Sequence, residues 1–160
     1  HDFTRRDGTM TENRKSLEKY YNLWQETTVL YERWARRRGL TYNSLTVLIA
    51  VAGSAPASCT QKTICQDWAL PKQTVNTILK DFAKKGLLEL VPVEEDRRSK
   101  AIRLTKQGQF FCESTLADLK RLELFIMEQM DPALVDAMIS GMDLFCQYFR
   151  KGMEMEYEAL

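Results

Sequence analysis

The sequence predicts a mainly α-helical fold with one small β-hairpin, and three observations lead to that prediction. Apolar residues recur at spacings of three and four over much of the 160 residues, which is typical of amphipathic helices. Two short helical segments near the middle are separated only by a tight turn at 69–71. Two β-capable segments then bracket a charged turn at 94–100. The predicted order is therefore helix, turn, helix, hairpin, with long helices on both sides.

The first long helix is predicted from Glu12 to about Arg38 and is expected to end near Gly39. Basic residues in its last turn suit the negative end of a helix dipole. The residues that form its periodic stripe are Leu17, Tyr20, Tyr21, Trp24, Thr28, Tyr31 and Trp34. Such an aromatic stripe indicates a buried core or a subunit interface, and the wall of a ligand pocket is the alternative.

Two short helices are expected next. Asn43 is predicted to cap a helix over Leu45–Ala52. A Gly/Pro-containing loop then leads to a helix that is capped by Ser58 or Thr60 and ends near Trp68. The residues expected to be buried in this second helix are Ile64, Cys65 and Trp68.

The turn Ala69–Pro71 leads into a helix predicted over Pro71–Lys85 and ended by Gly86. Its apolar face consists of Val75, Ile78, Leu79 and Phe82. Its other face holds short or basic residues, which are Lys72, Gln73, Asn76, Thr77 and Lys80. The spacing thus predicts one buried face and one polar face.

A β-hairpin is predicted from strands over Leu87–Val93 and Ala101–Leu104, joined by the charged turn 94–100. A disordered charged loop is the alternative, and the apolar residues on both sides argue against it.

Two helices are expected to complete the chain. Thr105 is predicted to cap the first, which runs to about Met130, and Asp131 with Pro132 begins the last. The apolar positions of the two helices are Phe110, Phe111, Leu116, Leu119, Leu122, Phe125 and Ile126, then Leu134, Val135, Met138, Ile139, Met142, Phe145 and Phe149.

Helix, turn, helix and hairpin in this order make a winged helix-turn-helix, whose second helix enters the major groove of DNA. Gln73 and Asn76 carry amides that can bind a base edge, with adenine as the favoured partner. The residues expected to meet phosphates are Lys72, Thr74, Thr77 and Lys80. Any surface helix has a polar face, so an ordinary surface helix is the alternative when this helix is taken alone.

The predicted hairpin favours the DNA interpretation. Arg97, Arg98 and Lys100 are expected at its tip, from which they could enter the minor groove and its negative potential. The three acidic residues at 94–96 argue against a simple attraction to phosphate. At least one of them is expected to pair with an arginine and fix the tip.

Charge is distributed unevenly along the chain. Residues 58–108 contain ten Lys/Arg against six Asp/Glu, whereas residues 109–160 contain four against ten. A basic middle beside an acidic end is expected where only one part of a chain meets a polyanion, and chance segregation is the alternative.

Several function classes are disfavoured by the residues present. The only histidine is His1, which removes His-based acid–base catalysis, Ser–His and Cys–His pairs and most zinc sites. The cysteines form no CxxC pair and are expected to be free thiols. No run of 18 apolar residues predicts a membrane helix, and no signal peptide is visible. We therefore expect no enzyme, no cofactor, no metal, no membrane association and a cytoplasmic protein.

The predicted organisation has four parts: a tag remnant over 1–9, an N-terminal dimerisation helix over 10–40, a winged helix-turn-helix domain over 41–108 and C-terminal dimerisation helices over 109–160. The long terminal helices carry more apolar surface than one small domain covers, which indicates a subunit interface. A symmetric homodimer predicts a near-palindromic operator in double-stranded DNA, with half-sites about 34–36 Å apart.

The segment Asp96–Gly108 resembles the wing signature of the MarR family, D-x-R, five residues, then L-T-x-x-G. All fixed positions match, and they are Asp96, Arg98, Leu104, Thr105 and Gly108. Upstream, Gln73–Asn76 followed by Leu79, 84–86 and Leu87 resembles that family's recognition helix and its exit. The similarity of helix order extends over nearly the whole chain after residue 9.

The resemblance implies a homodimeric winged-helix regulator whose first and last two helices intertwine. It also implies that Arg98, together with Arg97, reaches the minor groove and that Asp96 braces the wing. Members of the family are commonly repressors whose DNA affinity falls when a small, often aromatic, molecule binds or when a cysteine is oxidised.

The input to such a regulator has two candidate sites. A small aromatic ligand would lie between the dimer helices and the DNA-binding part, against Tyr20, Trp24, Tyr31 or Trp34, which are also candidates for the core. Cys59 precedes a helix N-terminus, whose dipole favours a thiolate, so it is the candidate redox residue, and a buried small hydrophobe is the alternative. The family's peroxide sensors carry their reactive cysteine near the start of the chain, and this sequence has none there. A winged-helix module that binds a protein and a thiol-based redox sensor are the alternative functions.

Overall fold

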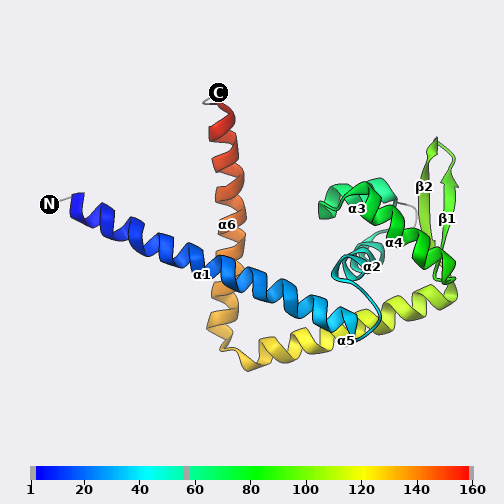
Figure 1. Cartoon of the computed structure of the whole chain (residues 1–160), viewed down its shortest axis with the longest axis horizontal. Helices are drawn as coiled ribbons and strands as arrows, with labels where there is room; N and C mark the ends of the chain where they lie inside the picture. Colours follow the sequence, from blue (N-terminus) through cyan, green and yellow to red (C-terminus); the bar gives the residue numbers. More distant parts are fainter. Residues whose placement is uncertain (1–2, 56–57, 159–160) are drawn as a thin grey trace. The chain divides into compact units, whose positions relative to one another are not determined.

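The computed structural model describes residues 3–55 and 58–158, in two compact units, residues 1–112 and residues 113–160. The described residues form six helices and one two-stranded sheet in the predicted order (Figure 1). The elements are α1 (Phe3–Arg36), α2 (Tyr42–Gly53), α3 (Gln61–Trp68), α4 (Lys72–Lys84), β1 (Leu88–Val93), β2 (Asp96–Leu104), α5 (Lys106–Gln129) and α6 (Pro132–Glu158). The predicted mainly α-helical fold with a β-hairpin wing is confirmed.

The core of the first unit lies where α2, α3, α4 and the hairpin meet (Figure 1). Leu45 and Val47 of α2, Ile64 of α3 and Leu79 of α4 are almost completely buried there. Each such side chain contributes about 1.5–3 kcal/mol relative to an exposed one. The predicted apolar face of α4 is buried in full, as Val75, Ile78, Leu79 and Phe82. Its opposite face is therefore left to solvent.

The first helix is longer than predicted at its start. It begins at Phe3, inside the segment interpreted as a tag remnant, and it ends at Arg36. The predicted end signal is confirmed, because Gly39 has a positive φ of 72° and the backbone N–H of Leu40 donates to the carbonyl of Ala35 at 3.0 Å. A glycine adopts this left-handed conformation without the strain that a Cβ brings.

Two helix caps differ from or sharpen the predictions. The N-cap of α2 is Thr41 and not Asn43, because the Thr41 hydroxyl accepts a hydrogen bond from the backbone N–H of Ser44 at 3.0 Å. Of the two caps proposed for α3, Thr60 is the one used, in a reciprocal capping box with Thr63. Polar residues near a helix start are common, and only the backbone geometry identifies the one that caps.

The expected burial in α3 is only partly confirmed. Ile64 is buried, whereas Cys65 is half-buried and Trp68 is 44% exposed. The predictions for Cys65 and Trp68 are wrong because α3 has only eight residues. It ends at Trp68, and the chain then turns through the left-handed residue Ala69, with φ of 50°.

The junction between the hairpin and α5 is held by Thr105, the predicted cap. Its hydroxyl donates to the carbonyl of Gly86 at 2.7 Å and accepts from the backbone N–H of Gly108 at 3.0 Å. The backbone N–H of Thr105 also donates to the carbonyl of Leu87 at 3.1 Å. One residue therefore caps α5 and fastens its first turn to the end of α4 and the start of β1.

The second unit consists of α5 from residue 113 onward and α6. The last helix begins at Pro132, as predicted, and Asp131 caps it, because its Oδ1 accepts from the backbone N–H of Ala133 at 2.8 Å. One side of α6 carries exposed apolar residues at helical spacing, and we name it the α6 stripe: Leu134, Met138, Met142, Phe145, Phe149 and Met153. An exposed apolar surface of this kind marks an interaction site.

Candidate nucleic-acid interface

The outward face of α4 carries the side chains that the sequence assigns to DNA. Lys72, Gln73, Thr77 and Lys80 are exposed, whereas Asn76 is half-buried. Thr74, the remaining predicted residue of this helix, is half-buried as well. The hydroxyl of Thr77 donates to the carbonyl of Gln73 at 2.9 Å, so only its acceptor lone pairs remain for a ligand.

The start of α4 is fixed by its neighbour α3 and by the turn between them. Pro71 is the N-cap in an extended conformation and not the first helical residue as predicted, so α4 begins one residue later, at Lys72. Pro71 makes no side-chain capping bond, and Gln61 of α3 donates from Nε2 to the carbonyl of Lys72 at 3.1 Å. This bond sets the position of the first turn of α4, which carries the amide of Gln73.

The wing is an antiparallel hairpin with a two-residue turn and an irregular register near its tip. Leu88 pairs with Leu104, and the register shifts at Pro92 and Val93. The second strand begins at Asp96, earlier than the predicted Ala101, so the segment 96–100 is strand and not turn. The physical reason is that an exposed two-stranded wing needs no apolar alternation on its charged side.

The wing is braced at both ends. Asp96 accepts a hydrogen bond on Oδ1 from the backbone N–H of Arg98 at 3.0 Å. Arg103 forms an ion pair with Glu89 across the strands at 2.7 Å. At its base, the backbone N–H of Ile102 donates to the carbonyl of Cys59 at 2.9 Å, which ties β2 to the segment before α3. The predicted pairing of an acidic residue at the tip with an arginine thus joins the Asp96 carboxylate to the backbone N–H of Arg98 and not to its guanidinium.

Between α3, α4 and β2 lies a cavity of about 470 Å³, which we name the wing-side cleft. Its lining contains five cationic side chains, which are Lys62, Lys72, Lys80, Arg98 and Lys100. Among the described residues, no carboxylate forms an ion pair with any of the five. Asp96 is the one acid in the lining, and it is engaged by the backbone of Arg98. The cleft is therefore strongly positive.

On the other flank of α4, a second cavity of about 770 Å³ is formed with α1 and the start of α2. We name it the α1-side cleft. Its charged lining residues are Glu32, Arg33 and Arg36 of α1, and α4 contributes Gln73, Thr74, Thr77 and Ile78. This cavity was not predicted, since its residues are distant in the sequence.

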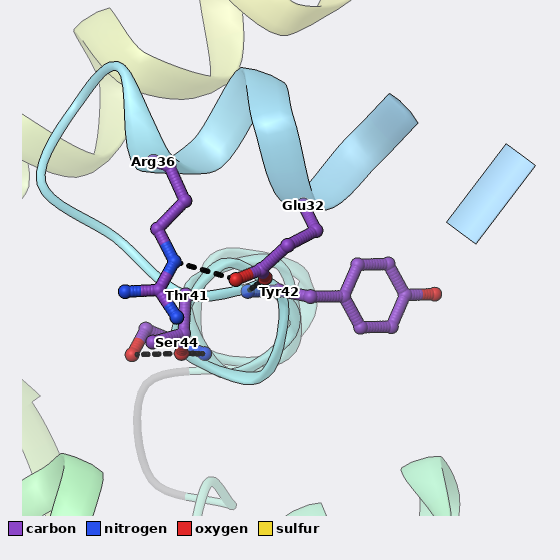
Figure 2. A network of polar contacts seen from close by, with 5 residues as sticks. All are labelled: Glu32, Arg36, Thr41, Tyr42 and Ser44. Carbon is purple, nitrogen blue, oxygen red and sulfur yellow. Dashed lines mark hydrogen bonds and ion pairs between the residues drawn. The ribbon is translucent and has the colours of Figure 1, made fainter. Parts of the chain in front are cut away.

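A small polar network fixes the wall of the α1-side cleft (Figure 2). Glu32 accepts from Nε of Arg36 at 2.6 Å and from the backbone N–H of Tyr42 at the start of α2. The bond from Arg36, followed by that from Tyr42, holds the pKa of the Glu32 carboxyl below its ordinary value of 4.5. Figure 2 shows the Tyr42 ring pointing away from this ion pair.

The predicted DNA-binding residues are thus divided between two clefts. The wing-side cleft contains Lys72, Asn76, Lys80, Arg98 and Lys100. The α1-side cleft contains Gln73, Thr74 and Thr77. Arg97 lies on β2, and its side chain is outside the described part of the chain. Lys62 was not predicted, since it is a single lysine on a short helix, and only its helical position relative to Ile64 could have placed it outward.

The four aromatic residues proposed for a ligand pocket do not line either cleft. Tyr20 and Trp24 stack on each other at a centroid distance of 6.3 Å, and Trp24 is 61% exposed. The ring of Trp34 lies under the guanidinium of Arg38 at 3.8 Å. Tyr31 contacts the ring of Tyr42 edge to face, and Tyr42 lines the α1-side cleft.

The cysteines do not support the predicted redox role of Cys59. Cys59 is buried, and that burial raises the pKa of its thiol, only partly opposed by a hydrogen bond with Ser54. The expectation of a thiolate favoured by the helix dipole is therefore wrong at this position. Cys112 is also buried, whereas Cys65 is half-buried and Cys146 is exposed.

Residues 3–55 and 58–158 contain neither a metal-ligand cluster nor a membrane-spanning helix. No group of three or more His, Cys, Asp or Glu side chains is arranged to hold a metal ion in this part of the chain. None of its helices combines the length and the apolar character needed to cross a membrane.

Known structures share this fold. A MarR family regulator from Neisseria meningitidis is 24% identical, with a TM-score of 0.71 over 88% of this chain and 98% of the other. The Staphylococcus aureus MepR–DNA complex is 18% identical, with a TM-score of 0.71 over 81% and 97%. BpsR from Bordetella bronchiseptica, in a structure on regulation of its DNA binding by 6-hydroxynicotinic acid, is 17% identical, with a TM-score of 0.68 over 82% and 98%.

No curated protein sequence matches this chain significantly. The model of the MarR family matches residues 38–99. That segment contains Thr41, α2, α3, α4, β1 and residues 96–99 of β2, which together provide the lining of both clefts apart from Lys100 and the residues of α1. The resemblance to the MarR family is thereby confirmed over residues 38–99, and the chain as a whole shares the fold of solved MarR family regulators.

Proposed function

We propose that this protein is a homodimeric repressor that binds a near-palindromic operator, with α4 in the major groove and the wing in the minor groove. The wing-side cleft is the observation that supports this most directly, because five cations from three elements converge there. Duplex DNA carries one negative charge per about 1.7 Å of axis, so a backbone that passes between the two grooves suits this cleft.

Different side chains serve affinity and specificity in this proposal. Gln73 and Asn76 read base edges, since an amide can donate and accept at once. Arg98 enters the minor groove, and Asp96 fixes the backbone from which it projects. Lys72, Lys80 and Lys100 contact phosphates, which sets the position of α4 without selecting a sequence.

The test is binding to the promoter of the protein's own gene against random duplex, for the wild type and Arg98→Ala. We expect the variant to lose about 1–3 kcal/mol of operator binding at fixed salt. An unchanged operator affinity would remove Arg98 from the interface. Little DNA affinity and a weak salt slope in the wild type would favour the alternative of a winged helix that binds a protein.

The α6 stripe is the feature that supports dimerisation. Met142 lies at the middle of this exposed apolar surface, and Ser140 lies on the opposite side of the same helix. We expect Met142→Glu to shift sedimentation from dimer to monomer, because it places a charge in an apolar interface. Ser140→Glu adds the same charge and is expected to leave the dimer intact, and equal effects of the two would argue against this interface.

Release of DNA by a small aromatic ligand is the regulatory part of the proposal. Tyr31 supports it, since its ring contacts Tyr42 at the wall of a cleft beside α4. The similar BpsR structure concerns regulation of DNA binding by 6-hydroxynicotinic acid, which makes that acid a suitable probe. We expect the acid to weaken operator binding by the wild type and to do so less in Tyr31→Ala. An effect of equal size in both proteins would exclude Tyr31 from the ligand site.

A further inference from the structure

The two clefts lie on opposite flanks of the same helix. The residues of α4 that line the wing-side cleft are Lys72, Asn76, Leu79 and Lys80. Those that line the α1-side cleft are Gln73, Thr74, Thr77 and Ile78. At 100° per residue, these two sets point to different sides of the helix, with the exposed face of Gln73 and Lys80 between them. A helix that enters a groove with this face leading therefore has one cleft on each side.

A helix in the major groove meets the backbones of both DNA strands. The groove is about 12 Å wide, which is close to the diameter of a helix with its side chains, so one strand runs along each flank. In the proposed function, the wing-side cleft meets the strand that lies between the major groove holding α4 and the minor groove holding the wing. The other strand must then pass the flank that α1 and α2 border.

The α1-side cleft offers cations to that second strand. Arg33 is exposed, and its side chain forms no hydrogen bond or ion pair with another described residue. Glu32 is the acid in the lining, and its charge is compensated by Arg36 and the backbone N–H of Tyr42. Figure 2 shows that only Nε of Arg36 is joined to Glu32, which leaves the two terminal nitrogens of that guanidinium for another anion.

We propose that the α1-side cleft holds a phosphodiester group of the DNA strand opposite the wing, with Arg33 as its main contact and Arg36 beside it. The first helix, which the sequence assigns to dimerisation, would then also clamp the duplex. This inference rests on the proposed function, because it needs α4 in the major groove.

The experiment measures the affinity of the purified dimer for the operator across a salt series, for the wild type, Arg33→Ala, Arg33→Lys and Arg37→Ala. Arg37 is the matched control, since it is exposed, lies four residues further on and lines neither cleft. We expect Arg33→Ala to weaken operator and random duplex alike, by about tenfold. The slope of the logarithm of its binding constant against the logarithm of salt concentration is expected to fall in magnitude by about two per dimer, because one phosphate contact is lost in each protomer.

The two remaining variants separate charge from helix stability. Arg33→Lys keeps the charge and is expected to retain most of the slope, whereas Arg37→Ala is expected to stay within about twofold of the wild type. Urea midpoints of all four proteins are measured in parallel, because a basic last turn also stabilises a helix end. A loss of affinity in Arg33→Ala without a change of the salt slope would overturn the phosphate contact. A fall in the urea midpoint large enough to explain the loss of affinity would overturn it as well.

Failure of the inference and failure of the proposed function give different results. If the wild type binds its operator and Arg33→Ala behaves as Arg37→Ala, the α1-side cleft carries no phosphate and the function stands. If the wild type does not discriminate the operator from random duplex, the proposed function falls and the inference falls with it.

Discussion

A Cβ atom added at Gly108 would lie 1.6 Å from the carbonyl oxygen of Leu87. The same carbonyl accepts the backbone N–H of Thr105, and Thr105 in turn accepts the backbone N–H of Gly108. The spacing L-T-x-x-G at the end of the wing therefore has a packing reason. A threonine caps α5, and three residues later only a glycine allows the helix to touch the start of β1.

Gly108→Ala is expected to destabilise the fold by about 3 kcal/mol or more, since the methyl group meets backbone that cannot rotate away. Urea unfolding followed by circular dichroism measures the loss. Gly53→Ala, at a position with open space around the added Cβ, is the control and is expected to be neutral or slightly stabilising. Equal stability of Gly108→Ala and the wild type would show that the junction relaxes.

Asn76→Ala and Lys80→Ala are expected to differ in kind, although both residues line the wing-side cleft. Loss of an amide that reads a base should weaken binding to the operator by about 1–3 kcal/mol and change binding to random duplex little. Loss of a lysine that contacts phosphate should weaken binding to both duplexes by a similar factor. Competition binding with the two duplexes distinguishes these patterns, and parallel losses in Asn76→Ala would remove it from base recognition.

The bond network of Glu32 predicts a pH-dependent contribution to stability. Because its folded pKa is lowered, the contribution is complete above the ordinary carboxyl value of 4.5 and is lost as the pH falls through the folded value. We expect Glu32→Gln to be less stable than the wild type at pH 7, with the difference shrinking as the pH falls below 4.5. Glu26→Gln, at an exposed position of α1, is the control. A constant difference over this range would contradict the assignment.

Oxidants are expected to act independently of Cys59, whose thiol is buried and has a raised pKa. Labelling of the folded protein with a thiol reagent at pH 7 should give the same number of fast-reacting thiols in the wild type and in Cys59→Ser. Operator binding by both should respond equally to peroxide. Loss of a fast-reacting thiol in Cys59→Ser would restore the redox hypothesis.

Much of the fold could be predicted because its helix ends are encoded locally. Gly39 and Gly86 adopt left-handed conformations at the predicted helix ends, and Thr105 and Asp131 cap the predicted helix starts. Each signal depends on residues a few positions apart. The alternation of buried and exposed residues in α4 is equally local, which is why its inner face was predicted without error.

The clefts could not be predicted, because residues distant in the sequence form them. Arg33 and Thr77 both line the α1-side cleft, and Lys62 and Arg98 both line the wing-side cleft. Neither pair has a spacing that a periodicity argument can detect. The early start of β2 was missed for a different reason, since Asp96, Arg98 and Lys100 at the outer end of the wing are exposed and carry no apolar alternation.

The measurement that tests the central claim most directly is a footprint of the wild-type dimer on the DNA around its own promoter, with random duplex as competitor and a salt series. We expect tight binding that survives the competitor and weakens with salt, and a protected site with two related halves about one duplex turn apart. Binding no stronger than to random duplex, with a shallow salt slope and no protected site, would contradict that claim.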